Sequence, residues 1–261
     1  MNQPDTVQTL PGIGASRQPL SGARAARGKL IAVVGCDGSG KSTLTADILT
    51  DLARDHPTEL SYLGLGSGEL GNRIKRFRFG GAAIERLLAR RAKQTRTKGA
   101  KIPGLATALV VYGFSLLRLR RFRRMLALRD RGVTVITDRY PQIEVPGFYD
   151  GPGLSAATAG SRIVAWLAAR ERRLYVWMAE QLPDLVIRLN VDVETACARK
   201  PDHDPESLRQ KVAVTPQLKF HDAPIIDLDS RAPYAEMRAA ALAAIDGVLA
   251  ESLATRTRVA A

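Results

Sequence analysis

Nine residues near the N-terminus constrain the fold of this chain more than any other feature. They read GCDGSGKST from Gly35 to Thr43 and satisfy the pattern G-x-x-x-x-G-K-[ST]. An apolar, β-branched run, Leu30–Val34, precedes them, and an amphipathic stretch, Ser42–Arg54, follows. A strand, a glycine-rich loop and a helix in this order form the setting in which the pattern binds phosphate. The sequence therefore predicts a β-loop-α unit with a phosphate-binding loop (P-loop).

The residue types of this loop suit a nucleoside triphosphate with Mg²⁺. Glycines let the backbone pass close to the phosphates, while the loop N–H groups and the helix N-terminus meet the negative charge. Lys41 is expected to reach the β- and γ-phosphates, and Ser42 to offer its hydroxyl to Mg²⁺. The alternative, a glycine-rich turn with a chance lysine, requires four fixed positions to coincide, which argues against it. The predicted ATP-binding residues are Gly35, Asp37, Gly38, Ser39, Gly40, Lys41, Ser42 and Thr43.

Apolar, β-branched runs alternate along the chain with longer segments of helical period. This alternation is typical of a parallel sheet covered by helices on both faces. Strands are expected at Leu30–Val34, Leu60–Leu63, Val133–Thr137, Leu185–Leu189 and Ile225–Leu228. Helices are expected at Ser42–Arg54, Asn72–Arg90, Thr107–Arg129, Ser161–Gln181, Val193–Lys200 and Tyr234–Ala250. The sequence thus predicts the α/β class, as a three-layer α/β/α P-loop NTPase fold with a five-stranded parallel sheet and a lid.

The length of 261 residues favours one domain with appendages, because two full cores need more chain. Residues 1–28 are rich in Pro, Gly, Ser, Gln and Ala without apolar periodicity, which predicts a disordered tail before a P-loop kinase domain at 29–255.

The two cysteines, Cys36 and Cys197, form no C-x-x-C pair, so we expect neither a disulfide framework nor a zinc site. Free thiols fit the cytoplasm. The apolar stretch Gly104–Leu117 is shorter than the roughly 20 residues that span a bilayer, so it predicts a buried helix. An apolar helix over Thr107–Leu117 would suit a homodimer interface.

The chain is strongly basic, with 39 Lys and Arg against 26 Asp and Glu and a formal charge of +13. This charge favours any polyanion, whether nucleotide, nucleic acid or anionic membrane. Five arginines gather within Arg118–Arg124, next to Leu119 and Phe122 on a helical pattern. For most of these arginines a solvated helix face is the favoured interpretation. A nucleic-acid footprint remains an alternative, although aromatic residues other than Phe122 are not interleaved.

Further motifs follow the P-loop in a fixed order. RGVTVITDRY (Arg131–Tyr140) ends in Asp-Arg-Tyr, GPGL (Gly151–Leu154) comes next, and PDLVIRLNVDVETACAR (Pro183–Arg199) follows. Together with VVGCDGSGKST, whose acidic Asp37 is characteristic, these segments resemble the thymidylate kinase family. The resemblance implies ATP-dependent phosphoryl transfer to a small acceptor, a nucleoside monophosphate such as dTMP.

The resemblance also implies roles for single side chains. Asp138 and Arg139 end an expected strand, at the sheet edge where open α/β folds bind ligands. Asp138 would hold Mg²⁺ through water and Arg139 would clamp phosphoryl oxygens, although a surface Asp-Arg pair is the alternative. The implied catalytic residues are Lys41, Asp37, Arg139 and Arg199, the acceptor-binding residues are Asp37, Arg118, Arg139 and Tyr149, and the metal-binding residues are Ser42 and Asp138.

Two departures from the family concern the acceptor side. Where the family carries a Glu-Pro-Gly-Gly-like turn, this chain has Gly64–Gly68 without Glu or Pro, and Phe148-Tyr149-Asp150 replaces an Ala-Tyr-Gln-like triplet. The acceptor pocket is therefore altered while the donor site is kept. Open alternatives are a kinase for a nucleoside, a sugar or a lipid-linked precursor, a non-catalytic nucleotide-binding regulator, and an NTP-driven nucleic-acid-binding protein.

The lid is expected at about 199–211, where Ala198–Lys211 is polar and contains prolines. Such composition predicts a loop. Cations that reach the phosphates only when a lid closes would come from Arg199, Lys200 or Arg209. Asp192 precedes a helical pattern and is interpreted as an N-cap. The three histidines, His56, His203 and His221, show no ligand spacing.

Overall fold

The computed structural model describes residues 27–64, 104–147, 150–156 and 158–260. Residues 1–26 of the expected tail, 1–28, and the expected helix Asn72–Arg90 lie outside these residues. The last two residues of that tail contact the domain, since Arg27 pairs with Asp130 and the Gly28 N–H donates to the Arg129 carbonyl at 2.7 Å. The described strands are β1 (Leu30–Gly35), β2 (Thr58–Tyr62), β3 (Thr134–Asp138), β4 (Leu185–Asn190) and β5 (Ile225–Asp229). The described helices are α1 (Lys41–Leu52), α4 (Leu105–Asp130), α5 (Arg162–Ala179), α6 (Val193–Arg199), α7 (Pro205–Val214) and α8 (Tyr234–Ala260). Short 3₁₀ turns are η1 (Leu154–Ala156), η2 (Thr215–Gln217) and η3 (Phe220–Asp222).

The strands form one parallel sheet in the order β2-β3-β1-β4-β5. The central strand β1 reads LIAVVG and is buried over its whole length, as a strand covered on both faces requires. In the register of β1 and β3, Val33 lies opposite Asp138. The end of β3 therefore lies beside the point where β1 enters the P-loop.

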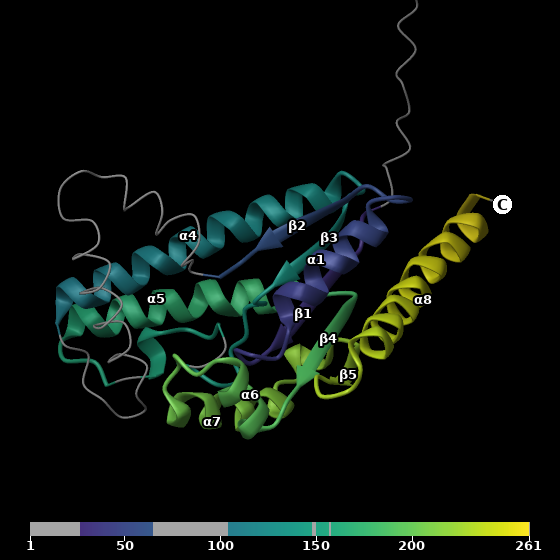
Figure 1. The fold of residues 1–261 in the computed structure, drawn as a ribbon. Helices are drawn as coiled ribbons and strands as arrows, with labels where there is room; N and C mark the ends of the chain where they lie inside the picture. Colours follow the sequence, from purple (N-terminus) through teal and green to yellow (C-terminus); the bar gives the residue numbers. More distant parts are fainter. Residues whose placement is uncertain (1–26, 65–103, 148–149, 157, 261) are drawn as a thin grey trace, which may run out of the picture.

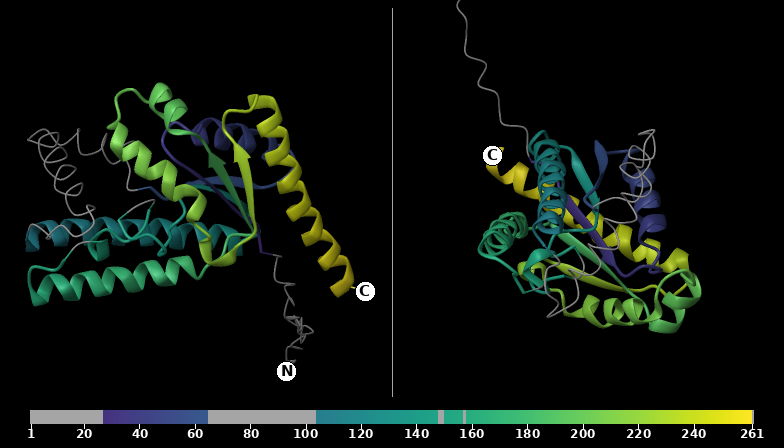
Figure 2. Two further views of the ribbon diagram at one scale, coloured as in Figure 1. Left: turned by 90° about the horizontal axis from the view of Figure 1, so that it is seen from below. Right: turned by 90° about the vertical axis from the view of Figure 1, so that its left-hand side faces the viewer.

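Alternate residues of β1 face two separate clusters of apolar side chains, because successive side chains of a strand point to opposite faces. Leu30, Ala32 and Val34 pack with side chains of α4 and α5, such as Phe122 and Tyr175. Ile31 and Val33 pack with side chains of α1 and α8, such as Ile48 and Ile245. Figure 1 and Figure 2 show α4 and α5 running side by side on one face of the sheet. The predicted three-layer α/β/α fold with a five-stranded parallel sheet is confirmed.

The edge strand is displaced from its expected position. The sequence predicts Leu60–Leu63, whereas β2 spans Thr58–Tyr62. The residues of β2 are exposed or half-buried because β2 is an edge strand with β3 as its neighbour. Its first residues are therefore polar, and the apolar pattern used to locate the strand begins only after them. Leu63 follows the strand and donates its N–H to the Asp138 carbonyl at 3.2 Å.

The lid region is a helix and not the expected loop. Helix α7 covers Pro205–Val214, with Asp204 accepting a hydrogen bond from the Ser207 N–H as its N-cap. Proline is favoured in the first helical turn, where its missing N–H would be unpaired anyway. Pro205 therefore begins a helix, and reading it as a loop signal was wrong. Helix α8 likewise continues beyond Ala250, the expected end.

Helix α4 buries only one side of its apolar half. Thr107, Ala108, Val111 and Ser115 are buried, but Leu109 is 52% exposed, and Leu105, Leu116 and Leu117 are also exposed. The segment is a helix, as expected, but it is buried on one side only. Among the described helices, none combines the length and the apolar character that a membrane crossing needs.

Candidate functional site

The P-loop connects β1 to α1 in the geometry that its glycines require. Gly38 and Gly40 have φ angles of 88° and 83°, in the left-handed region that glycine enters without steric cost. A Cβ on Gly38 would also lie 3.1 Å from the Ala196 carbonyl oxygen of α6. Gly40 is the N-cap of α1, so the first N–H groups of the helix open toward the loop. This arrangement can bind an anion at the helix N-terminus.

Lys41 extends into the concave side of the loop. Its Nζ donates a hydrogen bond to the Cys36 carbonyl oxygen at 2.7 Å, and its side chain is buried. Burial, and then the charge of Arg139, lowers the pKa of Lys41. Ser42 and Thr43 are exposed on the first turn of α1. The cation and the first turn of α1 therefore follow the loop directly, with the Ser42 and Thr43 side chains exposed.

Two later segments of the chain donate hydrogen bonds to backbone carbonyls of the P-loop. Arg199 at the end of α6 donates to the Gly38 carbonyl at 3.1 Å and to the Ser230 carbonyl at 2.9 Å. Ser230, after β5, donates through its hydroxyl to the Ser39 carbonyl at 2.9 Å. Arg199, expected as a mobile lid cation, is thus bound to backbone carbonyls of the loop and of the β5–α8 turn.

The end of β3 brings Asp138 and Arg139 to the loop. Asp138 is 9% exposed, and its Oδ1 has no hydrogen-bond partner among the described residues. Burial raises the pKa of Asp138, while the charges of Lys41 and Arg139 oppose this rise. Arg139 has a φ of 70°, a sparsely populated conformation for a residue with a side chain. Such outliers occur where neighbouring structure fixes the backbone, as at functional sites.

The oxygens of Ser42 and Asp138 are of the kind that Mg²⁺ prefers, and the unpartnered Oδ1 of Asp138 leaves one carboxylate oxygen available. The described residues contain no group of three or more His, Cys, Asp or Glu side chains that could hold a metal without further ligands. The two residues therefore fit Mg²⁺ that takes most of its ligands from phosphates and water.

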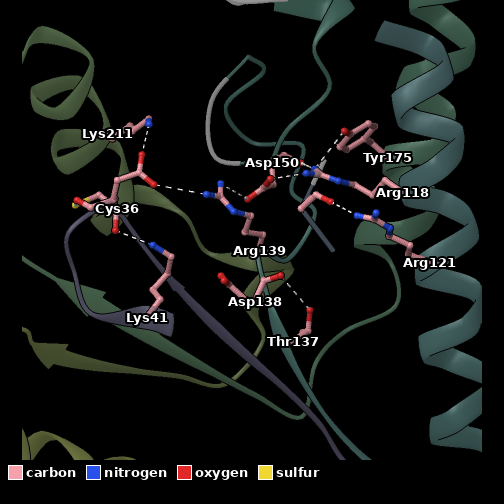
Figure 3. A network of polar contacts seen from close by, with 12 residues as sticks. Cys36, Lys41, Arg118, Arg121, Thr137, Asp138, Arg139, Asp150, Tyr175 and Lys211 are labelled. Carbon is pink, nitrogen blue, oxygen red and sulfur yellow. Dashed lines mark hydrogen bonds and ion pairs between the residues drawn. The ribbon is translucent and has the colours of Figure 1, made fainter. Parts of the chain in front are cut away.

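A row of alternating charges runs from the P-loop toward α4, as Figure 3 shows. Lys211 of α7 donates a hydrogen bond to Asp37 in the loop. The guanidinium of Arg139 lies 3.5 Å from Asp37 through Nη2 and 4.0 Å from Asp150 through Nη1. Burial alone would raise the pKa of Asp37, but Lys211, Lys41 and Arg139 together lower it to about 2. Asp37 is therefore an anion at any physiological pH.

Arg118 ends this row inside the protein. It is 1% exposed, pairs through Nη2 with the Asp150 carboxylate, and donates from Nη1 to the Asp150 carbonyl at 2.7 Å. Nη1 also lies 3.3 Å from the Tyr175 hydroxyl, and the guanidinium lies over the Tyr175 ring. Arg118, expected to contact the acceptor, is thus bound to Asp150 and Tyr175.

A buried carboxylate, Glu171 of α5, fixes the GPGL segment. It accepts hydrogen bonds from the N–H groups of Gly153 at 3.2 Å and Leu154 at 2.7 Å, and from the Ser115 hydroxyl at 2.7 Å. Burial raises the pKa of Glu171, and these three donors oppose the rise. The loop that carries Asp150 is thereby tied to both α4 and α5.

The structure brings most of the sequence-predicted residues to one sheet edge. Tyr149 and the turn after Gly64 lie outside the described residues, so their roles stay predictions. Four residues of the site were not predicted from the sequence: Asp150, Glu171, Lys211 and Ser230. Lys211 lies in the segment that was expected to be a loop, and Asp150 was interpreted only as a departure from a family triplet. The N-cap role of Asp192 is confirmed, since it accepts from the Thr195 N–H at 2.7 Å.

The chain is similar to two proteins of Escherichia coli strain K12. It is 49% identical over 222 residues to the uncharacterized ATP-binding protein YghS, covering 85% of this chain and 94% of YghS. It is 48% identical over 209 residues to the uncharacterized ATP-binding protein YghR, covering 80% of this chain and 83% of YghR.

No profile of a known protein family matches the chain. Among solved structures, it is 14% identical to deoxyadenosine kinase from M. mycoides with bound dCMP and dCDP, with a TM-score of 0.45 over 83% of this chain and 98% of that one. The same enzyme with bound dATP gives a TM-score of 0.43. By its sequence identity over most of its length, the chain belongs to the family of YghS and YghR.

Proposed function

We propose that this protein transfers the γ-phosphoryl group of ATP, with Mg²⁺, to a small acceptor. The observation that carries the proposal is the position of Asp138 and Arg139 beside the P-loop lysine, at the carboxyl ends of neighbouring parallel strands. Asp138 is also expected in a protein that only binds nucleotide with Mg²⁺, but such a protein would not need Arg139 as a second cation close to Lys41. The names of YghS and YghR as ATP-binding proteins support ATP as the donor.

The residues would act mainly by positioning and by neutralising charge, because phosphoryl transfer needs little covalent chemistry from the protein. Backbone N–H groups of the loop and Lys41 would hold the phosphates. Ser42 and Asp138 would hold Mg²⁺, which when bound bridges phosphate oxygens and neutralises their charge. Arg139 would orient the group that is transferred.

The α6–α7 segment, about residues 199–211, is the proposed lid. Arg199 was expected to supply a catalytic cation, but its contacts with the Gly38 and Ser230 carbonyls favour a supporting role for the loop. Lys211 is the better candidate for a cation at the phosphates, because it already reaches the loop at Asp37. Residues 29–255 are the proposed kinase domain, with 1–28 as a tail. The cytoplasm is the proposed location of the protein, because the reaction needs a supply of ATP.

A nucleoside monophosphate such as dTMP is the first acceptor to test, since the motifs around the donor site resemble thymidylate kinases. A nucleoside, a sugar or a lipid-linked precursor is the alternative, because the expected Glu-Pro turn is missing at Gly64–Gly68. The ion pairs of Arg118 and Arg139 with Asp150 bear on the choice between these acceptors.

We also propose that the outer side of α4 and α5 is a homodimer interface. Its support is that α4 and α5 lie side by side and that each exposes apolar side chains, where Leu109 of α4 is 52% exposed and Ile163 and Trp166 of α5 are 58% and 54% exposed. Apolar side chains exposed in a group mark interaction surfaces more often than scattered ones do.

An acceptor screen with ATP and Mg²⁺ tests the proposed activity, with ADP release as the readout. Release that depends on an acceptor supports a kinase, and the Lys41→Ala variant should abolish it. Hydrolysis stimulated by DNA would favour the nucleic-acid alternative, and ATP binding without any turnover would favour a regulator. Either result would overturn the proposal.

A further inference from the structure

Asp150 lies between two arginines that could otherwise bind a phosphate. Its Oδ1 pairs with Arg118, and its Oδ2 lies 4.0 Å from the Nη1 of Arg139. Guanidinium groups are the side chains best suited to bind phosphate oxygens through paired hydrogen bonds. Figure 3 shows the Asp150 carboxylate in the space between the two guanidinium groups. The space between the two guanidinium groups is therefore occupied by a carboxylate of the chain itself.

The backbone holds Asp150 in this place from several sides. The Gly147 N–H donates to the Pro152 carbonyl at 3.1 Å, which closes the loop around it. The next two residues after Pro152, Gly153 and Leu154, donate their N–H groups to buried Glu171. Asp150 itself has a φ of 63°, a left-handed conformation that aspartate adopts more readily than most residues. These contacts make Asp150 a fixed part of the site.

Both arginines are already paired with carboxylates of the chain. Arg118 is almost fully buried, and removal of one member of a buried ion pair leaves an uncompensated charge. Arg139 lies between Asp150 and Asp37, so its charge is already shared by two carboxylates. Lys211, the remaining cation of the row, is bound to Asp37. An acceptor phosphate placed here would meet two carboxylates whose partner cations are engaged.

We infer that Asp150 takes the place of an acceptor phosphate, and that the acceptor is an uncharged molecule with a free hydroxyl group, such as a nucleoside or a sugar. This inference rests on the proposed phosphoryl transfer and narrows its substrate class. The acceptor hydroxyl oxygen forms a bond to the γ-phosphorus, and the bond from that phosphorus to the β–γ bridging oxygen breaks. ADP leaves with the electron pair of that bond, and the hydroxyl proton passes to water. Asp37, which stays ionised, accepts a hydrogen bond from an acceptor hydroxyl.

Phosphate binding tests the inference without knowledge of the true acceptor. The full chain is saturated with the β,γ-imido analogue of ATP and Mg²⁺, and inorganic phosphate is titrated by calorimetry. Asp150→Asn, which removes the carboxylate charge and keeps the shape, should bind phosphate at least about tenfold more tightly than wild type. Asp150→Glu keeps the charge and should behave as wild type. Equal phosphate binding by wild type and Asp150→Asn would overturn the inference.

Paired acceptors provide the second measurement, which is decisive even if Asp150→Asn does not fold. Wild type is assayed for ADP release with nucleosides and sugars and with their monophosphates, so that each pair differs only in the phosphate. The uncharged member of the preferred pair should have a kcat/KM at least about tenfold higher. A preference for the phosphorylated member would overturn the inference and leave the proposed kinase function intact. Failure of wild type to bind the ATP analogue would instead overturn the proposed function, and the inference with it.

Discussion

Lys211 of α7 donates a hydrogen bond to Asp37 of the P-loop, across 174 positions of the sequence. The contact joins the proposed lid to the phosphate-binding loop through a charged pair that is only partly exposed. Hydrogen bonds between two ionised groups are stronger than those between neutral ones. The position of α7 over the loop therefore depends on the charge of both partners.

Removal of Lys211 should lower stability in a pH-dependent way. Burial opposes ionisation of Asp37, but Lys211, Lys41 and Arg139 lower its pKa from 3.8 to about 2. An acid whose folded pKa is lowered stabilises the fold above its unfolded pKa, and this contribution is lost as the pH falls from about 4 to about 2. For Lys211→Met we expect the free energy of unfolding at pH 7 to be lower than in wild type by about 1–2 kcal/mol. Between pH 4 and 2 the free energy of unfolding of this variant should fall less than that of wild type.

Denaturant unfolding at several pH values measures both effects. Arg209→Ala is the matched control on the same helix, because Arg209 is exposed and pairs only locally with Glu206. Such surface pairs contribute about 0–1 kcal/mol. Equal losses for the two variants, or an unchanged pH slope in Lys211→Met, would contradict a role of Lys211 in fixing the lid.

The Lys41→Ala variant should lose activity while remaining folded. Lys41 is the loop cation closest to the expected phosphates, and deletion of one preorganised charge-stabilising group costs about 10²-fold or more in kcat. The exposed Lys219→Ala variant is the control for a general loss of positive charge. ATP-dependent turnover close to wild type in Lys41→Ala would show that the P-loop assignment is wrong.

Arg118→Ala and Arg120→Ala should differ strongly although both change an arginine of α4. Arg118 is buried against Asp150 and Tyr175, so its removal leaves the Asp150 charge without its main partner and should cost about 3–5 kcal/mol. Arg120 is exposed, and its replacement should change stability by about 0.5 kcal/mol or less. Thermal and denaturant unfolding measure both. A fully stable Arg118→Ala protein would contradict the buried ion pair.

The sequence predicted the parts of this site that depend on local patterns. The G-x-x-x-x-G-K-[ST] spacing specifies the loop, and the buried run that ends in Asp138-Arg139 specifies a strand end, so both could be located before their contacts were known. The partners of these residues depend on tertiary packing. Nothing local indicates that Lys211 reaches Asp37, because that contact requires α7 to fold back over the loop. The lid helix α7 was not predicted because proline breaks a helix in its middle but is favoured in its first turn, where Pro205 lies.

Trp166→Asp should reduce self-association if α4 and α5 form a homodimer interface. Trp166 is 54% exposed on α5, close to Arg170, which lies over its ring. A carboxylate in the centre of an apolar interface would have to be desolvated, so the variant should be monomeric at concentrations at which wild type is dimeric. Analytical ultracentrifugation measures the mass, with the exposed Glu236→Lys of α8 as a control. A wild type that is monomeric at all concentrations would refute the interface.

Asp37→Asn separates the two sides of the proposed active site. A carboxylate inside a phosphate-binding loop repels the phosphates unless it has a task, and here it attracts Lys211 and Arg139. The amide has nearly the same shape but lacks the charge, so both cations should lose their fixed positions while the loop backbone stays in place. We therefore expect kcat/KM for the acceptor to fall by about 10²-fold, and the affinity for ATP with Mg²⁺ to change by less than about threefold. Steady-state ADP release gives the first quantity and calorimetry with the imido analogue gives the second. If ATP affinity instead fell as much as acceptor turnover, Asp37 would act on Mg²⁺, because loss of a carboxylate that orders the metal weakens the nucleotide complex itself.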